Sequence, residues 1–459
     1  MEPATQAAKS FREAEEGKGT GGNEYVRLEE INRELFNKGM WSGISAIAEF
    51  YWKKVFGFQT ALLETMIDGN GALTKFAERE AAVARMIAEE YPKAIRYVES
   101  EYGLHLDNGG YIKVAETPRF ELYQVLPTND VQVREGGKPI VIIPPYVLGP
   151  HILAFLPGEQ KSYVHAFANQ GIPTYIRIVR NINTTPDVQI MTGEDDATDT
   201  RFFCDKVSQI HHKPITLSGF CQGGFIATLD LLSGELDGLV DALITCVSPM
   251  DGTRSKAITD YINCLPSRYR ELDYAVKTLP NGNRVVDGGI MSWVFKLMSM
   301  DSESPVAAFH RDLEMFSKSN GNGISKTAAA LNYWMKYDQR DLPLEITRLS
   351  HQSYTVPVAP DGALPVQLFG RPLNFKRIKE DNIRWLLCYA AGDNLIDPPA
   401  ALAPLDYIKV EVTKYSKGHG AIATSHSDPK SKTSLDHVFP DGSRGPVRFQ
   451  LDLDAALVA

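Results

Sequence analysis

The chain has few cysteines, no long apolar run and no basic block, and each absence excludes a class of protein. Its 459 residues include five cysteines, none in a Cys-x-x-Cys pair. Neither a disulfide framework nor a zinc site is therefore expected, and the thiols indicate a reducing compartment. No stretch of about 18 apolar residues occurs, which argues against a membrane-spanning helix. The formal net charge of -9 argues against nucleic acid as a partner.

The N-terminal quarter is polar at first and then helical in pattern. Residues 1–24 carry four glycines and no apolar core, so we expect them to be disordered and to be neither a signal peptide nor an anchor. From 25 to 112 apolar residues recur at helical spacing with little strand signal. A helical N-terminal region of a cytoplasmic protein is therefore predicted.

Beyond residue 113 short β-rich runs alternate with helical ones. The predicted helices lie at 194–210 and 222–233, and the predicted strands at 120–126, 140–143, 174–179, 215–220, 242–247, 385–390 and 410–415. Such alternation predicts an α/β fold with a mostly parallel sheet covered on both faces.

The alternation stops in the second half of the chain, where a helix-rich insert intervenes. An insert at the carboxyl edge of a sheet is placed to act as a lid. We therefore assign 113–248 and 380–440 to an α/β core, 249–379 to a lid, and 441–459 to a C-terminal tail.

The stretch 214–230 carries the strongest chemical signal. A short apolar strand runs into Cys221, and an apolar helix opens directly behind it. Gly219 and Gly223 flank the cysteine at two residues on either side, followed by Gly224, and small neighbours let strand and helix pass close together. The positive end of the helix favours a reactive thiolate at Cys221. The alternative is a buried structural cysteine in an ordinary turn.

A nucleophile on such a turn is typical of the α/β-hydrolase fold, in which an acid and a histidine follow later in the chain. Asp393 follows the strand at 385–390, and His419 follows the last strand between two glycines. These residues are the candidate orienting acid and general base for Cys221. Asp251 is the reserve acid, whereas Asp397 precedes two prolines and suits a turn or a helix start.

Four other histidines are given no catalytic role. His426 and His437 fall in polar sequence and are expected to be solvated. His151 and His165 follow the first long apolar strand. They are candidates to line the entrance of the site, although a packed or surface position is expected.

Acyl transfer also needs donors for the oxyanion of its tetrahedral intermediate. The backbone N–H of Gln222, next after the cysteine, is one candidate. The loop after the strand at 140–143 supplies the second, through Tyr146 or Val147, because the two prolines before them have no N–H. Chemistry of this kind requires no metal or cofactor.

These motifs resemble those of the polyhydroxyalkanoate synthases, and the similarity spans about residues 138–425. The hallmark box G-x-C-x-G-G of that family is similar to residues 219–224. Further similarities are P-P-W-I at 144–147, W-R-N at 179–181, L-x-Y-W through N-L-P at 331–343, G-x-P-[VI]-D at 370–374, E-D-H-I-V-P at 392–398 and S-G-H at 417–419.

The resemblance implies that Cys221 is the nucleophile, His419 the general base and Asp393 its orienting acid. It further implies an acyltransferase that takes hydroxyacyl-CoA through an acyl-cysteine to a polyester. Such an enzyme would be a cytoplasmic, granule-associated homodimer, with an accessory subunit as a further partner.

The chain departs from the family at several positions. Tyr146 and Val179 replace Trp, Lys417 replaces Ser, Asn394 replaces His and Asn374 replaces Asp. These changes bear on the substrate and leave two alternatives open. One is a cysteine esterase or thioesterase with the same triad, and the other is a non-catalytic granule or scaffold protein.

Overall fold

A computed structural model describes residues 51–69, 71–256, 275–291 and 325–457, together with 33, 44–45, 48–49, 258–259, 262 and 272. The predicted disordered segment 1–24 lies outside the described residues, as does much of the predicted lid between 292 and 324.

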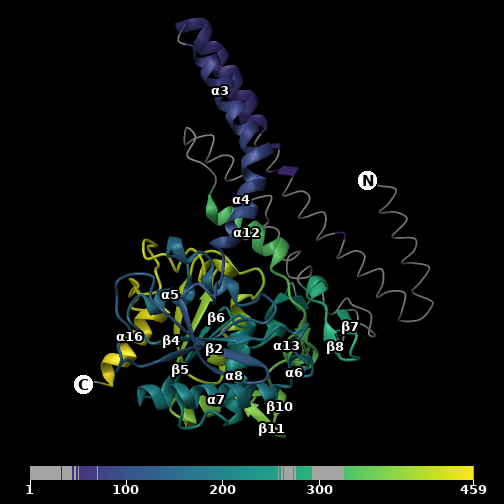
Figure 1. The fold of residues 1–459 in the computed structure, drawn as a ribbon, viewed down its shortest axis with the longest axis vertical. Helices are drawn as coiled ribbons and strands as arrows, with labels where there is room; N and C mark the ends of the chain where they lie inside the picture. Colours follow the sequence, from purple (N-terminus) through teal and green to yellow (C-terminus); the bar gives the residue numbers. More distant parts are fainter. Residues whose placement is uncertain are drawn as a thin grey trace, which may run out of the picture.

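An eight-stranded sheet forms the centre of the molecule (Figure 1). Its strands are β1 (Tyr111–Glu116), β2 (Phe120–Val125), β3 (Ile140–Ile143), β4 (Thr174–Val179), β5 (Ile215–Phe220), β6 (Val240–Cys246), β12 (Arg384–Ala390) and β13 (Glu411–Tyr415). The seven strands predicted from sequence are confirmed to within two residues at each end.

The strand order is β1-β2-β4-β3-β5-β6-β12-β13. β2 runs antiparallel to both β1 and β4, and the strands from β4 to β13 are parallel to one another. With a sharp bend at the end of β5, this order is that of the α/β-hydrolase fold, as predicted.

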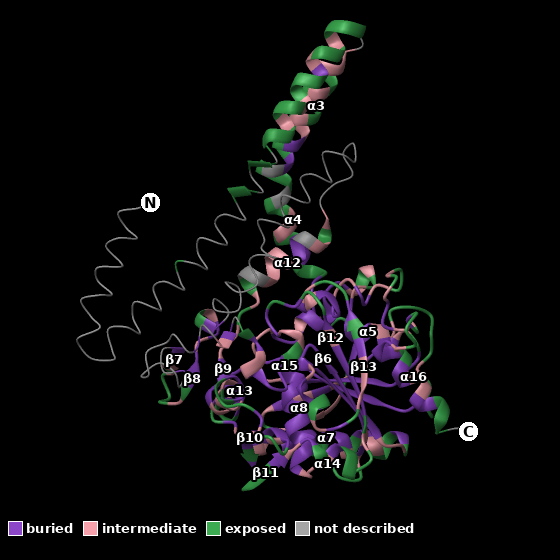
Figure 2. Ribbon diagram, turned by 180° about the vertical axis from the view of Figure 1, so that it is seen from behind, coloured by how far each residue is buried: buried purple, intermediate pink, exposed green. Residues whose placement is uncertain are grey.

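The sheet is buried on both faces, which explains its continuous apolar strands. All four residues of β3 are fully buried, and successive side chains point to opposite faces. Val141 and Ile143 join one core cluster, whereas Ile140 and Ile142 join the other. Figure 2 shows this buried interior in the body of the molecule.

Helices cover both faces of the sheet. α7 and α8 pack on β5 from one side, α5 packs on β4 and α16 packs on β12. Besides a helix at 51–68, the described α-helices are α3 (Ala72–Arg85), α4 (Tyr91–Tyr97), α5 (Tyr163–Ala168), α6 (Pro186–Gln189), α7 (Gly193–His211), α8 (Gln222–Ser233), α12 (Lys326–Tyr337), α13 (Leu344–Thr355), α14 (Lys376–Glu380), α15 (Pro398–Ala401) and α16 (Pro446–Ala456).

The described part of the insert consists of several pieces that pack at different places on the molecule. A small sheet joins β7 (Val276–Thr278), β8 (Arg284–Val286) and β9 (Leu342–Pro343), and α13 leads from it across α7 and α8. α12 packs instead on α4 of the N-terminal region. A separate hairpin follows, formed by β10 (Ala363–Leu368) and β11 (Arg371–Asn374).

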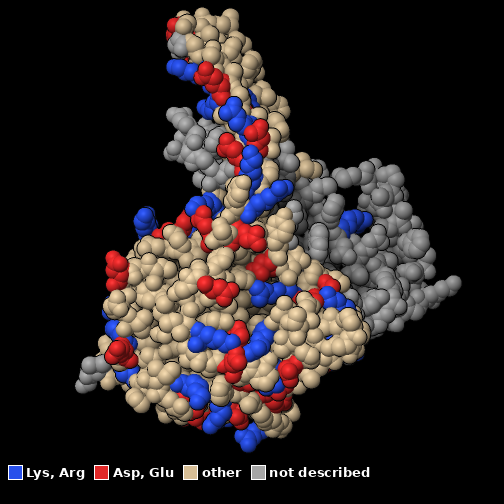
Figure 3. Space-filling model, in the orientation of Figure 1, with Lys and Arg blue, Asp and Glu red and all other residues tan. Residues whose placement is uncertain are grey.

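An arm of two helices projects from the body (Figure 1). Residues 51–68 form one helix and α3 forms the other, and the rings of Phe58 and Phe76 meet edge to face between them. Large apolar side chains on the arm are exposed, Met66 to 75% and Ile67 to 78%. On the face shown in Figure 3, acidic and basic side chains intermingle along the arm.

β1 and α16 are among the elements that were not predicted from sequence. β1 is an edge strand whose residues are mostly exposed or half-buried, so it lacks an apolar run. The segment 441–459, assigned above to a tail, contains α16, which buries Val447, Phe449 and Leu453 in the core.

Candidate active site

Cys221 lies at the bend between β5 and α8. Its backbone has φ 52° and ψ -127°, a conformation that side-chain-bearing residues rarely adopt. The Cys221 N–H donates to the carbonyl oxygen of Cys246 at 2.8 Å, which ties the bend to the end of β6. The thiol is therefore held at a fixed, strained turn, 7% exposed.

Two glycines allow this bend. A Cβ on Gly219 would lie 2.3 Å from the Cα of Gly224, and a Cβ on Gly223 would lie 2.3 Å from the carbonyl oxygen of Ile143. Both distances are far inside van der Waals contact with backbone atoms, which have little freedom to move. The glycine spacing in the sequence therefore reports real close approaches of α8 to β5 and β3.

His419 and Asp393 meet at the ends of β13 and β12. His419 Nδ1 lies 2.8 Å from Asp393 Oδ2, and the other carboxylate oxygen accepts the N–H groups of Leu395 and Ile396, each at 2.9 Å. Because a carboxylate only accepts, Nδ1 carries the proton and donates it. The remaining nitrogen, Nε2, is left to act on a neighbouring group.

Cys221 is close enough to His419 to influence its protonation. Burial alone would lower the pKa of His419, but Asp393 and the Cys221 sulfur raise this pKa well above its ordinary value. Among the described residues, Nε2 has no hydrogen bond of ordinary geometry. The sulfur is thus close enough to act on the ring electrostatically without being a well-aligned partner. Apo sites often show such loose alignment.

The competing acids are engaged elsewhere. Asp251 accepts the N–H of Thr253 at 3.2 Å and pairs with Arg254 at 3.0 Å. Asp397 accepts the N–H of Lys256 at 2.8 Å and directly precedes α15, which agrees with the helix start predicted for it. Of the three acids considered, the structure brings only Asp393 to His419.

One prediction about the other histidines is wrong. His426 is buried, with Nε2 against the carbonyl oxygen of Ser416 at 2.9 Å and Nδ1 against Thr433 at 2.7 Å. Its polar sequence neighbours concealed this position, because they fold back over β13. His165 is packed as expected, and burial lowers its pKa to about 4.

The loop after β3 separates two cavities. Val147 lines an apolar pocket of about 60 Å³ that contains Cys221, and Tyr146 lines a cavity of about 410 Å³ on the other side. The Val147 N–H donates to the side-chain oxygen of Gln222 at 3.1 Å. Of the two predicted loop donors, Val147 is therefore the one whose N–H is directed at the residue after the nucleophile.

The larger cavity is not the one with the nucleophile. It is lined in part by Arg177, Arg180 and Arg340, whereas the small pocket holds Cys221 beneath residues of the insert such as Tyr354 and Met291. The candidate nucleophile is the Cys221 sulfur, so we place the candidate site in the small pocket that this residue lines.

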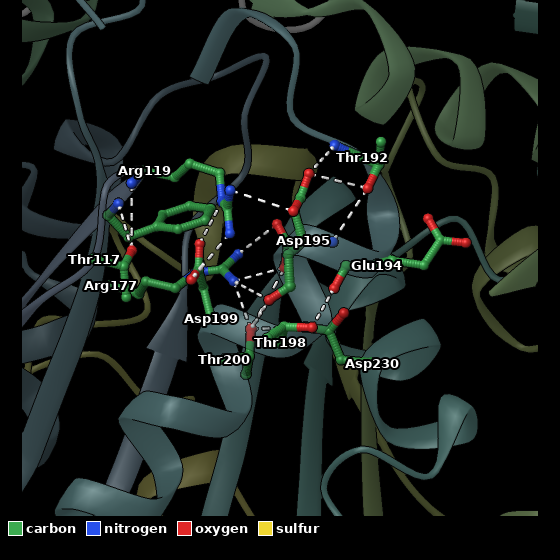
Figure 4. A network of polar contacts seen from close by, with 12 residues as sticks. Thr117, Arg119, Arg177, Thr192, Glu194, Asp195, Thr198, Asp199, Thr200 and Asp230 are labelled. Atoms are coloured by element: carbon green, nitrogen blue, oxygen red, sulfur yellow. Dashed lines mark hydrogen bonds and ion pairs between the residues drawn. The ribbon is translucent and has the colours of Figure 1, made fainter. Parts of the chain in front are cut away.

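Figure 4 shows a network of polar contacts that includes Arg177, Thr200 and Asp230. The Tyr146 hydroxyl donates to Asp196, which also accepts two bonds from Arg177, at 2.6 and 3.1 Å. Thr200 connects this pair to Asp230 of α8 at 2.9 Å. Burial and the charge of Asp196 raise the pKa of Asp230 well above its ordinary value. The network thus links the loop after β3 to the helix behind Cys221, a connection that sequence spacing did not reveal.

Two absences hold for the described part of the chain. No group of three His, Cys, Asp or Glu side chains is placed to hold a metal ion. None of the helices there combines the length and apolar character that a membrane crossing needs.

Comparison with known proteins gives similarity to solved structures alone. No family model matches the chain, and no curated protein matches it significantly. DcsB in complex with its substrate analogue is 14% identical, with a TM-score of 0.41 over 75% of this chain and 98% of that one. Est1E from Butyrivibrio proteoclasticus is 12% identical, with a TM-score of 0.37 over 68% and 91%. A thermophilic esterase from Thermogutta terrifontis is 13% identical, with a TM-score of 0.38 over 76% and 97%. Similarities this distant say nothing of the reaction, and the fold assignment depends on the strand order.

Proposed function

We propose that this protein is an acyltransferase that uses Cys221, His419 and Asp393 on hydroxyacyl-CoA thioesters, in the manner of the polyhydroxyalkanoate synthases. The enclosure of Cys221 carries the proposal. Cys221 lines a small apolar pocket together with residues of the insert, and the Cys221 sulfur raises the pKa of His419. A pocket this small and apolar limits the water that can reach an acyl-cysteine, which supports transfer to a second organic acceptor over hydrolysis.

The first half-reaction forms the acyl-cysteine. His419 holds the proton of Cys221, and the thiolate attacks the thioester carbonyl carbon. The N–H groups of Gln222 and Val147 stabilise the oxyanion. The carbon–sulfur bond to coenzyme A then breaks, and His419 returns the proton to the departing thiol. Asp393 keeps the ring in the tautomer that both steps need.

The second half-reaction extends the chain. His419 takes the proton of the hydroxyl group of another hydroxyacyl unit, whose oxygen attacks the acyl-cysteine. The Cys221 thiolate leaves as a new ester forms, so no oxidant or metal is consumed. We expect the enzyme to be a cytoplasmic, granule-associated homodimer that works with an accessory subunit. The limits of the α/β core and of the lid given above belong to the same proposal.

The test is incubation of the full chain with 3-hydroxybutyryl-CoA. Thiol release, an acyl adduct on Cys221 by intact-mass and peptide analysis, and insoluble polyester are the expected results. A Cys221→Ala protein should release no thiol and carry no adduct. Thiol release by that variant at the wild-type rate would overturn the proposal.

A cysteine esterase or thioesterase is the second candidate, favoured by the shared triad geometry with water as acceptor. It predicts free hydroxy acid in amounts equal to the thiol released, and no polymer. A protein that never acquires an acyl adduct would instead be the non-catalytic scaffold.

A further inference from the structure

The side chain of Gln222 connects the loop after β3 to helix α13 of the insert. Its carboxamide oxygen accepts the N–H of Val147 at 3.1 Å, and its nitrogen donates to Ser350 Oγ at 2.8 Å. Both Gln222 and Ser350 are buried, and Ser350 belongs to α13 of the insert. One amide group therefore bridges the loop after β3 and the helix that covers Cys221.

The first of these bonds occupies a group that catalysis needs. An oxyanion on the acylated carbon must accept from the Val147 N–H, but that N–H already points at the Gln222 oxygen. An amide oxygen and a thioester carbonyl oxygen compete for the same donor, and both cannot occupy it in full. Substrate binding must displace the side chain of Gln222.

The second bond couples this displacement to the lid. The pocket around Cys221 has about 60 Å³, room for a few water molecules, and Thr347, Ser350 and Tyr354 of α13 form part of its wall. A hydroxyacyl chain needs more space than this, so part of the wall has to move, and α13 is the part that Gln222 holds. When the carboxamide turns away from Val147, its geometry toward Ser350 is lost as well.

We propose that Gln222 is a substrate-released latch, in which its carboxamide stands in for the substrate carbonyl and holds α13 closed until a thioester displaces it. The inference concerns the site of the proposed function and rests on it for the identity of the displacing group. By thermodynamic linkage, any group that accepts the Val147 N–H in place of Gln222 favours the open position of α13. The open position of α13 in turn favours binding of that group at the Val147 N–H.

The latch is tested without substrate by the rate at which iodoacetamide alkylates Cys221 in the full chain, followed by peptide mapping. Gln222→Leu keeps the bulk but removes both bonds, and Ser350→Ala removes the bond to the lid. Either change breaks the single bond that holds α13, so each should speed alkylation about fivefold, the effect of one hydrogen bond. The double variant should be no faster than Gln222→Leu alone, because both changes break the same connection.

Ser353→Ala is the matched control, since the Ser353 hydroxyl donates to the Ser350 carbonyl within the same helix and not to Gln222. Its alkylation rate should equal that of the wild type. Wild-type rates in both Gln222→Leu and Ser350→Ala, or fully additive effects in the double variant, would overturn the latch. Because alkylation needs no thioester, this outcome is independent of whether the protein transfers acyl groups. If it does, Gln222→Leu should also lower KM for 3-hydroxybutyryl-CoA.

Discussion

Two helices with apolar sequences lie in opposite surroundings. Every residue of α8 is buried between the sheet, α7 and α13. The helix at 51–68 packs on α3 along one side, and its Trp52, Phe56 and Met66 remain largely exposed. Apolar spacing predicted a helix in both cases. Apolar spacing did not predict how many elements pack around each helix. That number decides whether a substitution changes the stability of the whole fold or has only a local effect.

The largest effect is expected where burial and chemistry coincide. In Asp393→Asn the amide would donate to His419 Nδ1, so Nε2 would carry the proton and could not accept one from Cys221. We expect kcat for thiol release to fall by about 10³ to 10⁴. Asp397→Asn, four residues along the same loop and bonded to Lys256, should retain nearly full activity. Similar losses in both variants would contradict the assignment of the acid.

Next in size is a substitution within α8 itself. Gly223→Ala places a methyl group against the backbone of Ile143 and Pro144. These backbone atoms cannot move aside without straining the surrounding core. Unfolding by urea should show a loss of about 3 kcal/mol. Gly158→Ala, where the added Cβ has open space, should change stability by about 0.5 kcal/mol or less. Equal stabilities would mean that the bend is looser than described.

A smaller effect is expected from the network beneath the loop. Tyr146→Phe removes a hydrogen bond to a buried carboxylate that keeps its two bonds to Arg177, so the loss of stability should be about 1.5 kcal/mol. Because the loop also carries Val147, kcat should fall while KM changes little. Tyr175→Phe loses a neutral bond to His211 and should cost stability without changing kcat. An unchanged kcat in Tyr146→Phe would separate the network from the site.

The smallest effect is expected at the tip of the arm. Met66→Glu and Ile67→Glu replace side chains that already face solvent, so thermal unfolding should reflect a change of about 0.5 kcal/mol or less. Thiol release should be unchanged as well. A large destabilisation would show that the tip is covered in solution, and the contrast with α8 would then fail.

The predictable parts of the molecule are those with a local cause. Glycine crowding around Cys221 and the order of the late strands were enough to select Asp393 and His419, because strand ends in a parallel sheet meet at one edge. The contacts of His426 come from polar residues 7 and 10 positions away, and the bond from Tyr146 to Asp196 spans 50 residues. Neither leaves a periodic signal in the sequence. Gln222 was identified by its backbone position, but the role of its side chain depends on Ser350, which no pattern connects to it.

The position of β6 between β5 and β12 has a consequence for biosynthesis. The segment that ends in Cys221 leaves the ribosome long before those bearing Asp393 and His419, and β12 must dock on β6 before the imidazole can reach the sulfur. A nascent chain stalled anywhere in the insert would carry its thiol without a proton acceptor. Under the proposed function, reactivity would thus emerge only with β12 and β13, after the segments that precede them have been synthesised.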